Sequence, residues 1–311
     1  VIIIGSGPAG ITLALKLEEK KINCLIIEAG KEKYDHDSQG FYEGVVVGDS
    51  ISNLKHSRLR QLGGTSGHWG GWCKPMDRFN IETWGLSFDE LSKYSKDTCN
   101  ILGLTNNFDK AELNDYFNQI QFQYSTVRFA KKFKNIIQKS KYINLVTMAH
   151  ATHFIGSNGV VDSVFIKFNK KDYILKSKLF VLGCGGVENS RVLLWTKELN
   201  NDLINKKMPI GNYWMTHPWI IGGIGVIKKS KLQKLLKDKF INYNGPLHIA
   251  TSKNIILDKN ILSGAIYMNA KEDTLLHKEI IKDLLCTSPK YGKKIARLLF
   301  DKNLKCGNIF M

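Results

Sequence analysis

The chain has 311 residues, of which 43% are hydrophobic and 23% charged, which is typical of a globular protein long enough for two domains. Its formal net charge is +17, but the lysines are scattered, and the sequence has no nucleic-acid-binding motif or basic helix with aromatic partners. The composition therefore favours a solvated, lysine-rich surface and argues against a nucleic-acid partner. No apolar run in the sequence reaches the roughly 18 residues of a membrane span.

The cysteines and the first residue bear on the cellular location of the protein. None of the six cysteines forms a C-x-x-C pair, and Cys24 and Cys184 lie in apolar runs, a pattern typical of reduced thiols. This favours a cytoplasmic location. The sequence begins at Val1 inside an apolar run, so we expect a missing N-terminal piece, which leaves a periplasmic location open.

The first predicted element is a strand, turn and helix. The apolar run Val1–Ile4 leads into a G-x-G-x-x-G turn, and a second apolar run, Cys24–Ile27, ends at Glu28. In such a turn the first Gly permits the bend, the second admits a pyrophosphate, and the third allows close helix packing. An acid at the position of Glu28 accepts hydrogen bonds from a ribose. The predicted dinucleotide-binding residues are Gly5, Ser6, Gly7, Pro8, Ala9, Gly10 and Glu28. A glycine-rich turn in another α/β fold is the alternative.

A second glycine-rich stretch follows a polar excursion over residues 31–60. Five glycines occur among residues 63–71, with small hydroxyl residues between them. Such a backbone can lie against a flat ligand and donate N–H groups to it. The rings of His68, Trp69 and Trp72 argue against a mere surface linker.

These residues resemble the glucose-methanol-choline (GMC) oxidoreductases, FAD enzymes that oxidise alcohols and sugars. The family's Arg-x-x-Gly-Gly-(Ser/Thr)-(Ser/Thr) segment, which lies along the isoalloxazine and pyrophosphate, corresponds to residues 60–66. The following His-Trp pair is most similar to the branch that holds pyranose oxidase and the flavoprotein subunits of gluconate and fructose dehydrogenases. The resemblance implies FAD contacts from Arg60, Gly63, Gly64, Thr65, Ser66, His68, Trp69 and Gly70. In parts of this branch the His at position 68 bonds covalently to the flavin 8α-methyl, and non-covalent packing against the flavin is the alternative.

Residues 91–141 have a helical, partly amphipathic pattern, which predicts a helical insertion. The strand pattern returns at residues 142–155, followed by a predicted hairpin over 159–175. A further buried strand, 178–182, leads into another glycine turn and a helix. The resemblance implies that the backbone of Ala151 faces the adenine, that Gly183 and Gly185 pass near the pyrophosphate, and that Asn189 and Arg191 tie the helix back.

His150 and His153 do not predict a metal site. Residues three apart on a strand point to opposite faces, and no further Cys or His has suitable spacing. We therefore expect no metal.

The predicted fold is α/β, with a Rossmann-like FAD-binding domain made of a parallel sheet and a β-meander over residues 1–40 and 142–218. Residues 41–141 are predicted to be a flavin-covering loop and helical insertion, and residues 219–311 the start of an α+β substrate domain with an antiparallel sheet. Within that last part the pattern predicts strands at 219–226 and 254–268, and helices at 228–239 and 271–300. His217, in a stretch similar to the family's Met-x-His-Pro segment, is predicted to be structural.

The resemblance implies FAD-dependent oxidation of a CH–OH group, with hydride transfer from the carbinol carbon of an alcohol or sugar to flavin N5. Oxygen, a quinone or a haem protein would accept the electrons. The family's catalytic His has no counterpart after Met268, so we expect the catalytic residues beyond Met311 and the chain to be an N-terminal fragment. Another two-domain FAD or NAD(P) oxidoreductase, and a non-catalytic flavin-binding remnant, are the open alternatives.

Overall fold

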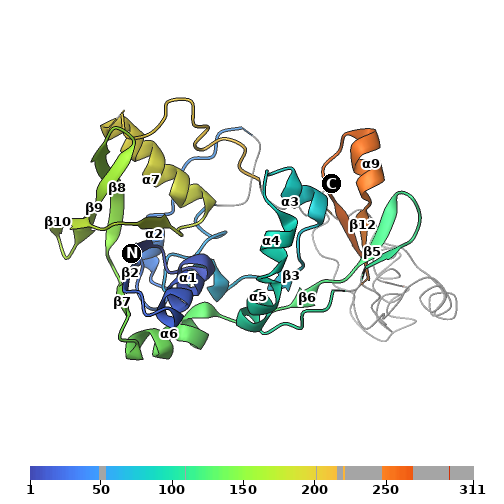
Figure 1. Ribbon diagram of the computed structural model, residues 1–311, viewed down its shortest axis with the longest axis horizontal. Helices are drawn as coiled ribbons and strands as arrows, with labels where there is room; N and C mark the ends of the chain where they lie inside the picture. Colours follow the sequence, from blue (N-terminus) through green and yellow to red (C-terminus); the bar gives the residue numbers. More distant parts are fainter. Residues whose placement is uncertain are drawn as a thin grey trace. The chain divides into compact units, whose positions relative to one another are not determined.

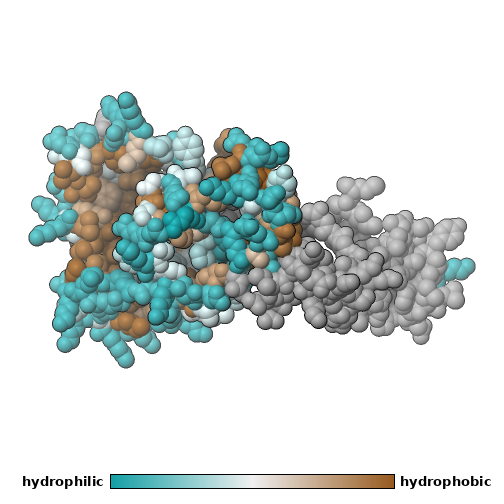
Figure 2. Space-filling model, turned by 45° about the vertical axis from the view of Figure 1, so that its right-hand side comes forward, coloured by the Kyte–Doolittle hydropathy of each residue, from teal (hydrophilic) through white to brown (hydrophobic). Residues whose placement is uncertain are grey.

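The computed structural model describes residues 1–48, 54–108, 110–200, 202–215, 220, 247–268 and 294. The chain divides into two compact units. One comprises Val1–Asp109 and Gln121–Ile227, and the other comprises Lys110–Ile120 and Lys228–Met311. Polar side chains cover much of the described surface, with apolar patches between them (Figure 2).

A four-stranded parallel sheet forms the centre of the first unit (Figure 1). Its strand order is β11 (Phe180–Leu182), β1 (Ile2–Ile4), β2 (Cys24–Ile27) and β7 (Ile143–Val146). All three pairings are parallel, which confirms the predicted strands and the parallel sheet. The continuous apolar runs form strands here because both faces of the sheet are buried.

Two apolar clusters cover the two faces of this sheet. On one face, Ile3 packs with helices α1 (Pro8–Glu19) and α6 (Phe129–Lys139). On the other face, Ile2 and Ile4 pack with the β-meander and with helix α7 (Gly186–Leu199). Alternate residues of β1 thus serve opposite layers, as the period of a strand requires.

The predicted β-meander is present as an antiparallel sheet of three strands. These are β8 (His150–Ser157), β9 (Val160–Phe168) and β10 (Lys171–Lys176), in the order β10-β9-β8. Its first strand is tied to α7, since the backbone N–H of Phe154 donates to Thr196 Oγ1 at 3.0 Å.

Short elements follow β2 in the first unit. They are α2 (His36–Gly40), the 3₁₀ helix η1 (Gly64–Gly67), β3 (Trp72–Cys73), α3 (Arg78–Glu82), α4 (Phe88–Ser92), α5 (Ser95–Leu102) and β6 (Gln123–Tyr124). β3 and β6 pair antiparallel.

The helical prediction for residues 91–141 is wrong between residues 110 and 124. β4 (Lys110–Glu112), β5 (Phe117–Ile120) and β6 lie there instead. Within β5, Asn118 and Ile120 are buried and Phe117 and Gln119 less so, which is the period of a strand. Its partner β12 lies more than 120 residues further along the chain, so the local pattern did not reveal the pairing.

An antiparallel sheet forms the described part of the second unit, with the order β13-β12-β5-β4. β12 (Leu247–Thr251) and β13 (Ala265–Met268) are joined by helix α9 (Lys253–Lys259). The strand predicted over residues 254–268 is therefore wrong in its first half. There Ser252 caps the helix by accepting a hydrogen bond from the N–H of Ile255.

The elements predicted at 219–226, 228–239 and 271–300, and His217, lie outside the described residues, apart from the single positions 220 and 294. Of the helices that the structure describes, none offers a run long and apolar enough to cross a bilayer.

Candidate cofactor-binding site

A cavity of about 1320 Å³ opens at the carboxyl ends of the parallel strands in the first unit. The turn after β1, the end of β2, the segment 57–60, the start of β8 and the turn after β11 line it. Small-molecule pockets usually measure about 300–1,000 Å³, so this cavity has room for an extended dinucleotide. The strand ends are also where open α/β sheets bind their ligands.

The three glycines of the first turn have different neighbours. A Cβ on Gly5, whose φ is +99°, would lie 2.7 Å from the backbone of Gly183, and one on Gly10 would lie 2.0 Å from the carbonyl oxygen of Gly5. The protein's own packing therefore requires these two. A Cβ on Gly7 would meet no protein atom closer than 3.7 Å, and Gly7 lines the cavity. The space beside Gly7 is therefore free for a ligand, as a pyrophosphate-binding turn requires.

Glu28 is buried and holds the first turn in place. One carboxylate oxygen accepts hydrogen bonds from the N–H and the hydroxyl of Ser6, and the other accepts from the N–H of Gly30 at 2.7 Å. A carboxylate offers about four acceptor positions. Three are used within the protein, so one is left for a ribose hydroxyl in the cavity that Glu28 lines.

The second glycine turn lies next to the first. The N–H of Gly183 donates to the carbonyl of Ile4 at 2.7 Å, and the side-chain oxygen of Asn189 accepts from the N–H of Cys184 at 2.9 Å. Gly185 has a φ of +84° and no other atom within 4 Å of a Cβ placed on it. Burial raises the pKa of the Cys184 thiol to about 12, so the wall of this turn carries no thiolate.

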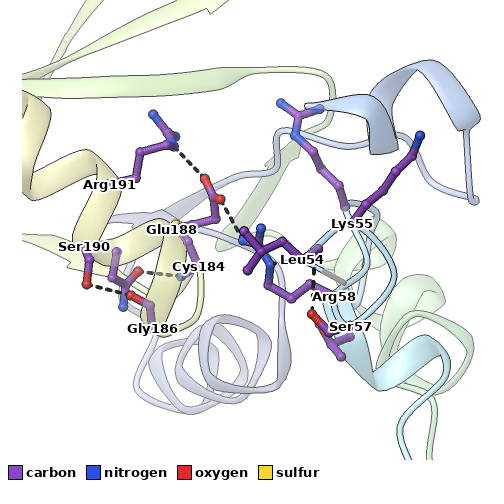
Figure 3. Close-up of polar contacts among 12 residues, drawn as sticks. Leu54, Lys55, Ser57, Arg58, Cys184, Gly186, Glu188, Ser190 and Arg191 are labelled. Carbon is purple, nitrogen blue, oxygen red and sulfur yellow. Dashed lines mark hydrogen bonds and ion pairs between the residues drawn. The ribbon is translucent and has the colours of Figure 1, made fainter. Parts of the chain in front are cut away.

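Glu188, in the first turn of α7, joins two arginines at the cavity (Figure 3). It accepts hydrogen bonds from Nη1 of Arg58 and from Nε of Arg191, each at 2.7 Å. Burial raises the pKa of the Glu188 carboxyl, but the hydrogen bonds from Arg191 and Arg58 outweigh it and keep the pKa below its ordinary value. The two cations and one carboxylate give this part of the wall a net positive charge, which suits a pyrophosphate.

Arg60 is also part of the cavity wall, and its guanidinium is bonded mostly to the protein. Its Nη1 donates to the carbonyl of Ala29 and the hydroxyl of Ser38, and its Nη2 donates to Nδ1 of His150 at 2.7 Å. The guanidinium carbon lies 4.6 Å from the centre of the Phe41 ring. Arg60 thus joins three residues of the wall, Ala29, Phe41 and His150, to Ser38 outside the lining, and burial lowers the pKa of Arg60.

The structure brings most of the predicted cofactor-binding residues together. Those that line the cavity are Gly5, Ser6, Gly7, Pro8, Ala9, Glu28, Arg60, Gly64, Thr65, Ala151, Gly183, Gly185 and Asn189. Those outside the lining are Gly10, Gly63, Ser66, His68, Trp69 and Gly70.

The residues outside the lining have other environments. Ser66 is fully buried, donates to the carbonyl of Gly63 and accepts from the N–H of Phe129. The indole N–H of Trp69 donates to the carbonyl of Val127 at 3.0 Å. His68 is exposed.

Sequence reasoning missed several side chains of the wall, among them Tyr42, Arg58, Glu188 and His150. Glu188 is 130 residues from Arg58 in the sequence, and the guanidinium carbon of Arg58 lies 4.0 Å from the centre of the Tyr42 ring. His150 was considered only as a metal ligand, although it adjoins Ala151. In the described part of the chain, no group of three or more His, Cys, Asp or Glu side chains is placed to hold a metal ion.

One comparison with known proteins supports a flavin site. Residues 1–84 match the family model described as an FAD binding domain. No curated protein matches the sequence.

The fold is similar to several solved structures. Pyridoxine 4-oxidase from Mesorbium loti is 16% identical with a TM-score of 0.44, over 61% of this chain and 50% of that one. Formate oxidase is 15% identical with a TM-score of 0.43, over 63% and 47%. A fungal aryl-alcohol oxidase is 11% identical with a TM-score of 0.44, over 63% and 47%.

The chain spans about half the length of the solved structures it matches. The matched family model indicates an FAD site. The glycine turns, the space beside Gly7 and the remaining acceptor position of Glu28 fit such a site. The chain therefore contains an FAD-binding domain.

Proposed function

We propose that the protein is an FAD-dependent oxidoreductase of the GMC type that oxidises a CH–OH group of a small alcohol or sugar. The observation that carries the proposal is the cavity where two glycine turns and Glu28 meet residues 60–65. The two glycine turns and Glu28 are features of an FAD-binding site. Residues 60–65 belong to the segment by which the sequence resembles this family.

Bound FAD supplies the hydride acceptor, and the chain's own residues hold it. Gly7 admits the pyrophosphate, and Glu28 accepts a hydrogen bond from the ribose. The pair of arginines around Glu188 balances the phosphate charge. Gly64 and Thr65, in the segment that resembles the family's flavin-contacting one, line the same cavity.

Spectroscopy of the purified protein tests the proposal. We expect a flavin absorption spectrum that bleaches when an alcohol or sugar from a panel is added without oxygen. Re-oxidation by oxygen, by a quinone or by a haem protein would then identify the electron acceptor. A folded protein that binds no FAD contradicts the proposal. A yellow protein that no alcohol or sugar bleaches contradicts the oxidation of a CH–OH group and leaves another FAD or NAD(P) oxidoreductase or a flavin-binding remnant.

Placement in the branch of pyranose oxidase, and covalent attachment of the flavin through His68, are finer proposals. Their support is the His-Trp pair after residues 60–66. Acid precipitation of the holoprotein tests the attachment: the flavin should stay with the pellet in the native protein and move to the supernatant in His68→Ala. Complete release from the native protein would exclude a covalent bond.

A further inference from the structure

The hydrogen bond between Arg60 and His150 fixes the state of the histidine. A guanidinium only donates hydrogen bonds, and Nη2 of Arg60 lies 2.7 Å from Nδ1 of His150. Nδ1 therefore accepts, so the ring is neutral and its proton is on Nε2. Burial, and then the charge of Arg60, lower the pKa of His150, in agreement with a neutral ring.

Nδ1 of His150 bonds to Arg60, and no hydrogen bond joins Nε2 to the residues that the structure describes. None of the buried side-chain nitrogens or oxygens in the described part of the chain lacks a partner, so Nε2 is an accessible atom. The residue is half-buried, lines the cavity, and has the edge of the Phe41 ring against it, with ring centres 5.4 Å apart. A fixed N–H donor without a protein acceptor is thus held in the wall of a ligand cavity.

The position of His150 indicates which half of FAD it contacts. Its neighbour Ala149 donates its N–H to the carbonyl of Glu28 at 3.0 Å, which joins the start of β8 to the end of β2. Glu28 is the acceptor for a ribose hydroxyl, and the glycine turns are at the pyrophosphate. His150 follows the residue that is bonded to the backbone of Glu28 and lines the same cavity, so its donor is placed for the adenosine half, whose ring nitrogens and ribose oxygens accept hydrogen bonds.

We propose that His150 determines specificity for the adenosine half of FAD by donating a hydrogen bond from Nε2, and that Arg60 is the positioning residue that fixes its tautomer. The fork of Arg60 suits this role because it reaches Ala29, Ser38 and His150 together. The inference rests on the FAD site and is independent of which substrate is oxidised.

Two substitutions of His150 distinguish the roles of its two ring nitrogens. His150→Asn keeps a polar group near the Nδ1 position but has no donor at Nε2, whereas His150→Gln places an amide N–H near the Nε2 position. With the flavin-free protein, titration calorimetry should show FAD and ADP bound about 3- to 10-fold more weakly by His150→Asn, the worth of one hydrogen bond. His150→Gln should recover most of the loss. FMN, which has no adenosine, should bind both variants and the native protein alike.

His153→Asn is the matched control. It is the same change on the same strand, and His153 stacks on Phe165 outside the cavity lining. Its FAD and ADP affinities should equal those of the native protein. Equal affinities in His150→Asn and His153→Asn would overturn the proposal, whereas a native protein that binds no FAD would overturn the proposed function itself.

Nitrogen-15 NMR of histidine-labelled protein provides a second measurement that needs no variant of His150. The native protein should show His150 protonated at Nε2 only, and Arg60→Met should show a mixture of tautomers with FAD affinity reduced about as much as in His150→Asn. A native His150 protonated at Nδ1 would contradict the proposal.

Discussion

Residues 5–10 and residues 60–70 are both glycine-rich, and the sequence predicts both to hold the cofactor. In the first segment every residue from Gly5 to Ala9 lines the cavity. In the second, the predicted contacts that line it are Arg60, Gly64 and Thr65. Of the other predicted contacts in the second segment, Ser66 and Trp69 bond to the protein and His68 is exposed, and in this the segment differs from the first.

The difference comes from what each glycine faces. A Cβ on Gly63 would lie 2.6 Å from the backbone N of Ala130, and one on Gly71 would lie 2.1 Å from the carbonyl oxygen of Ser125. These glycines let the segment pack against the entry to α6. Gly7 instead faces open space. A glycine-rich stretch can therefore serve a ligand or a helix, and only its surroundings distinguish the two.

The largest expected effect is on the stability of the first turn. Gly10→Ala places a Cβ 2.0 Å from the carbonyl oxygen of Gly5, so the backbone of the turn has to move. We expect the free energy of unfolding to fall by about 3 kcal/mol, measured by urea denaturation of the flavin-free protein. A variant as stable as the native protein would show that the turn is not packed as described.

Gly7→Ala should separate binding from folding. The nearest protein atom is 3.7 Å from the added Cβ, and the loss of glycine at the helix cap costs about 1 kcal/mol or less. FAD affinity should fall by about 10- to 100-fold, because the methyl group takes the place of the pyrophosphate. Calorimetry and urea denaturation on the same variant check this. An unchanged affinity would contradict the placement of the pyrophosphate at Gly7.

Ser66→Ala tests the structural role of the second segment. The change removes the hydrogen bonds to Gly63 and from Phe129 and leaves a buried N–H without its acceptor. We expect the free energy of unfolding to fall by about 1–2 kcal/mol and the FAD affinity to stay within about twofold of native. Thr65 is next to Ser66 but lines the cavity. Thr65→Ala should therefore lower the FAD affinity and change the free energy of unfolding little. A large loss of FAD affinity in Ser66→Ala, without one in Thr65→Ala, would contradict the structural role of Ser66.

The smallest expected effect concerns pH and the contact of Arg58, just before the second segment, with Glu188. The pKa of Glu188 is lower in the folded protein than its ordinary value of 4.5. The ionised carboxylate therefore stabilises the fold above about pH 4.5, and this contribution is lost as the pH falls through the lower, folded pKa.

The difference in unfolding free energy between native protein and Glu188→Gln should accordingly be largest at neutral pH and shrink in acid. Glu198→Gln replaces an exposed glutamate on the same helix and is the control, whose free energy of unfolding at neutral pH should lie within about 0.5 kcal/mol of native. A difference for Glu188→Gln that does not change with pH would contradict the ion pair.

Much of the first unit could be predicted because its signals are local. The apolar runs of β1 and β2, the glycine turn and Glu28 lie within 28 consecutive residues, and β11 with its turn repeats the pattern. The errors are at β4, β5 and β6, which were expected to be helical, and at α9, which was expected to be a strand. These are short elements whose form depends on a partner strand or a cap, and a partner distant in the sequence leaves little trace in a local period.

The sequence by itself determined the class of fold, the dinucleotide turn and its acid, since each follows from backbone geometry over a few residues. Only the tertiary structure decided which glycines face the ligand and which face the protein. It alone brought Arg58 to Glu188 and Arg60 to His150. The physical reason is that hydrogen-bond partners in a cavity wall come from segments about 90 to 130 residues apart, and their meeting depends on the packing of the whole unit.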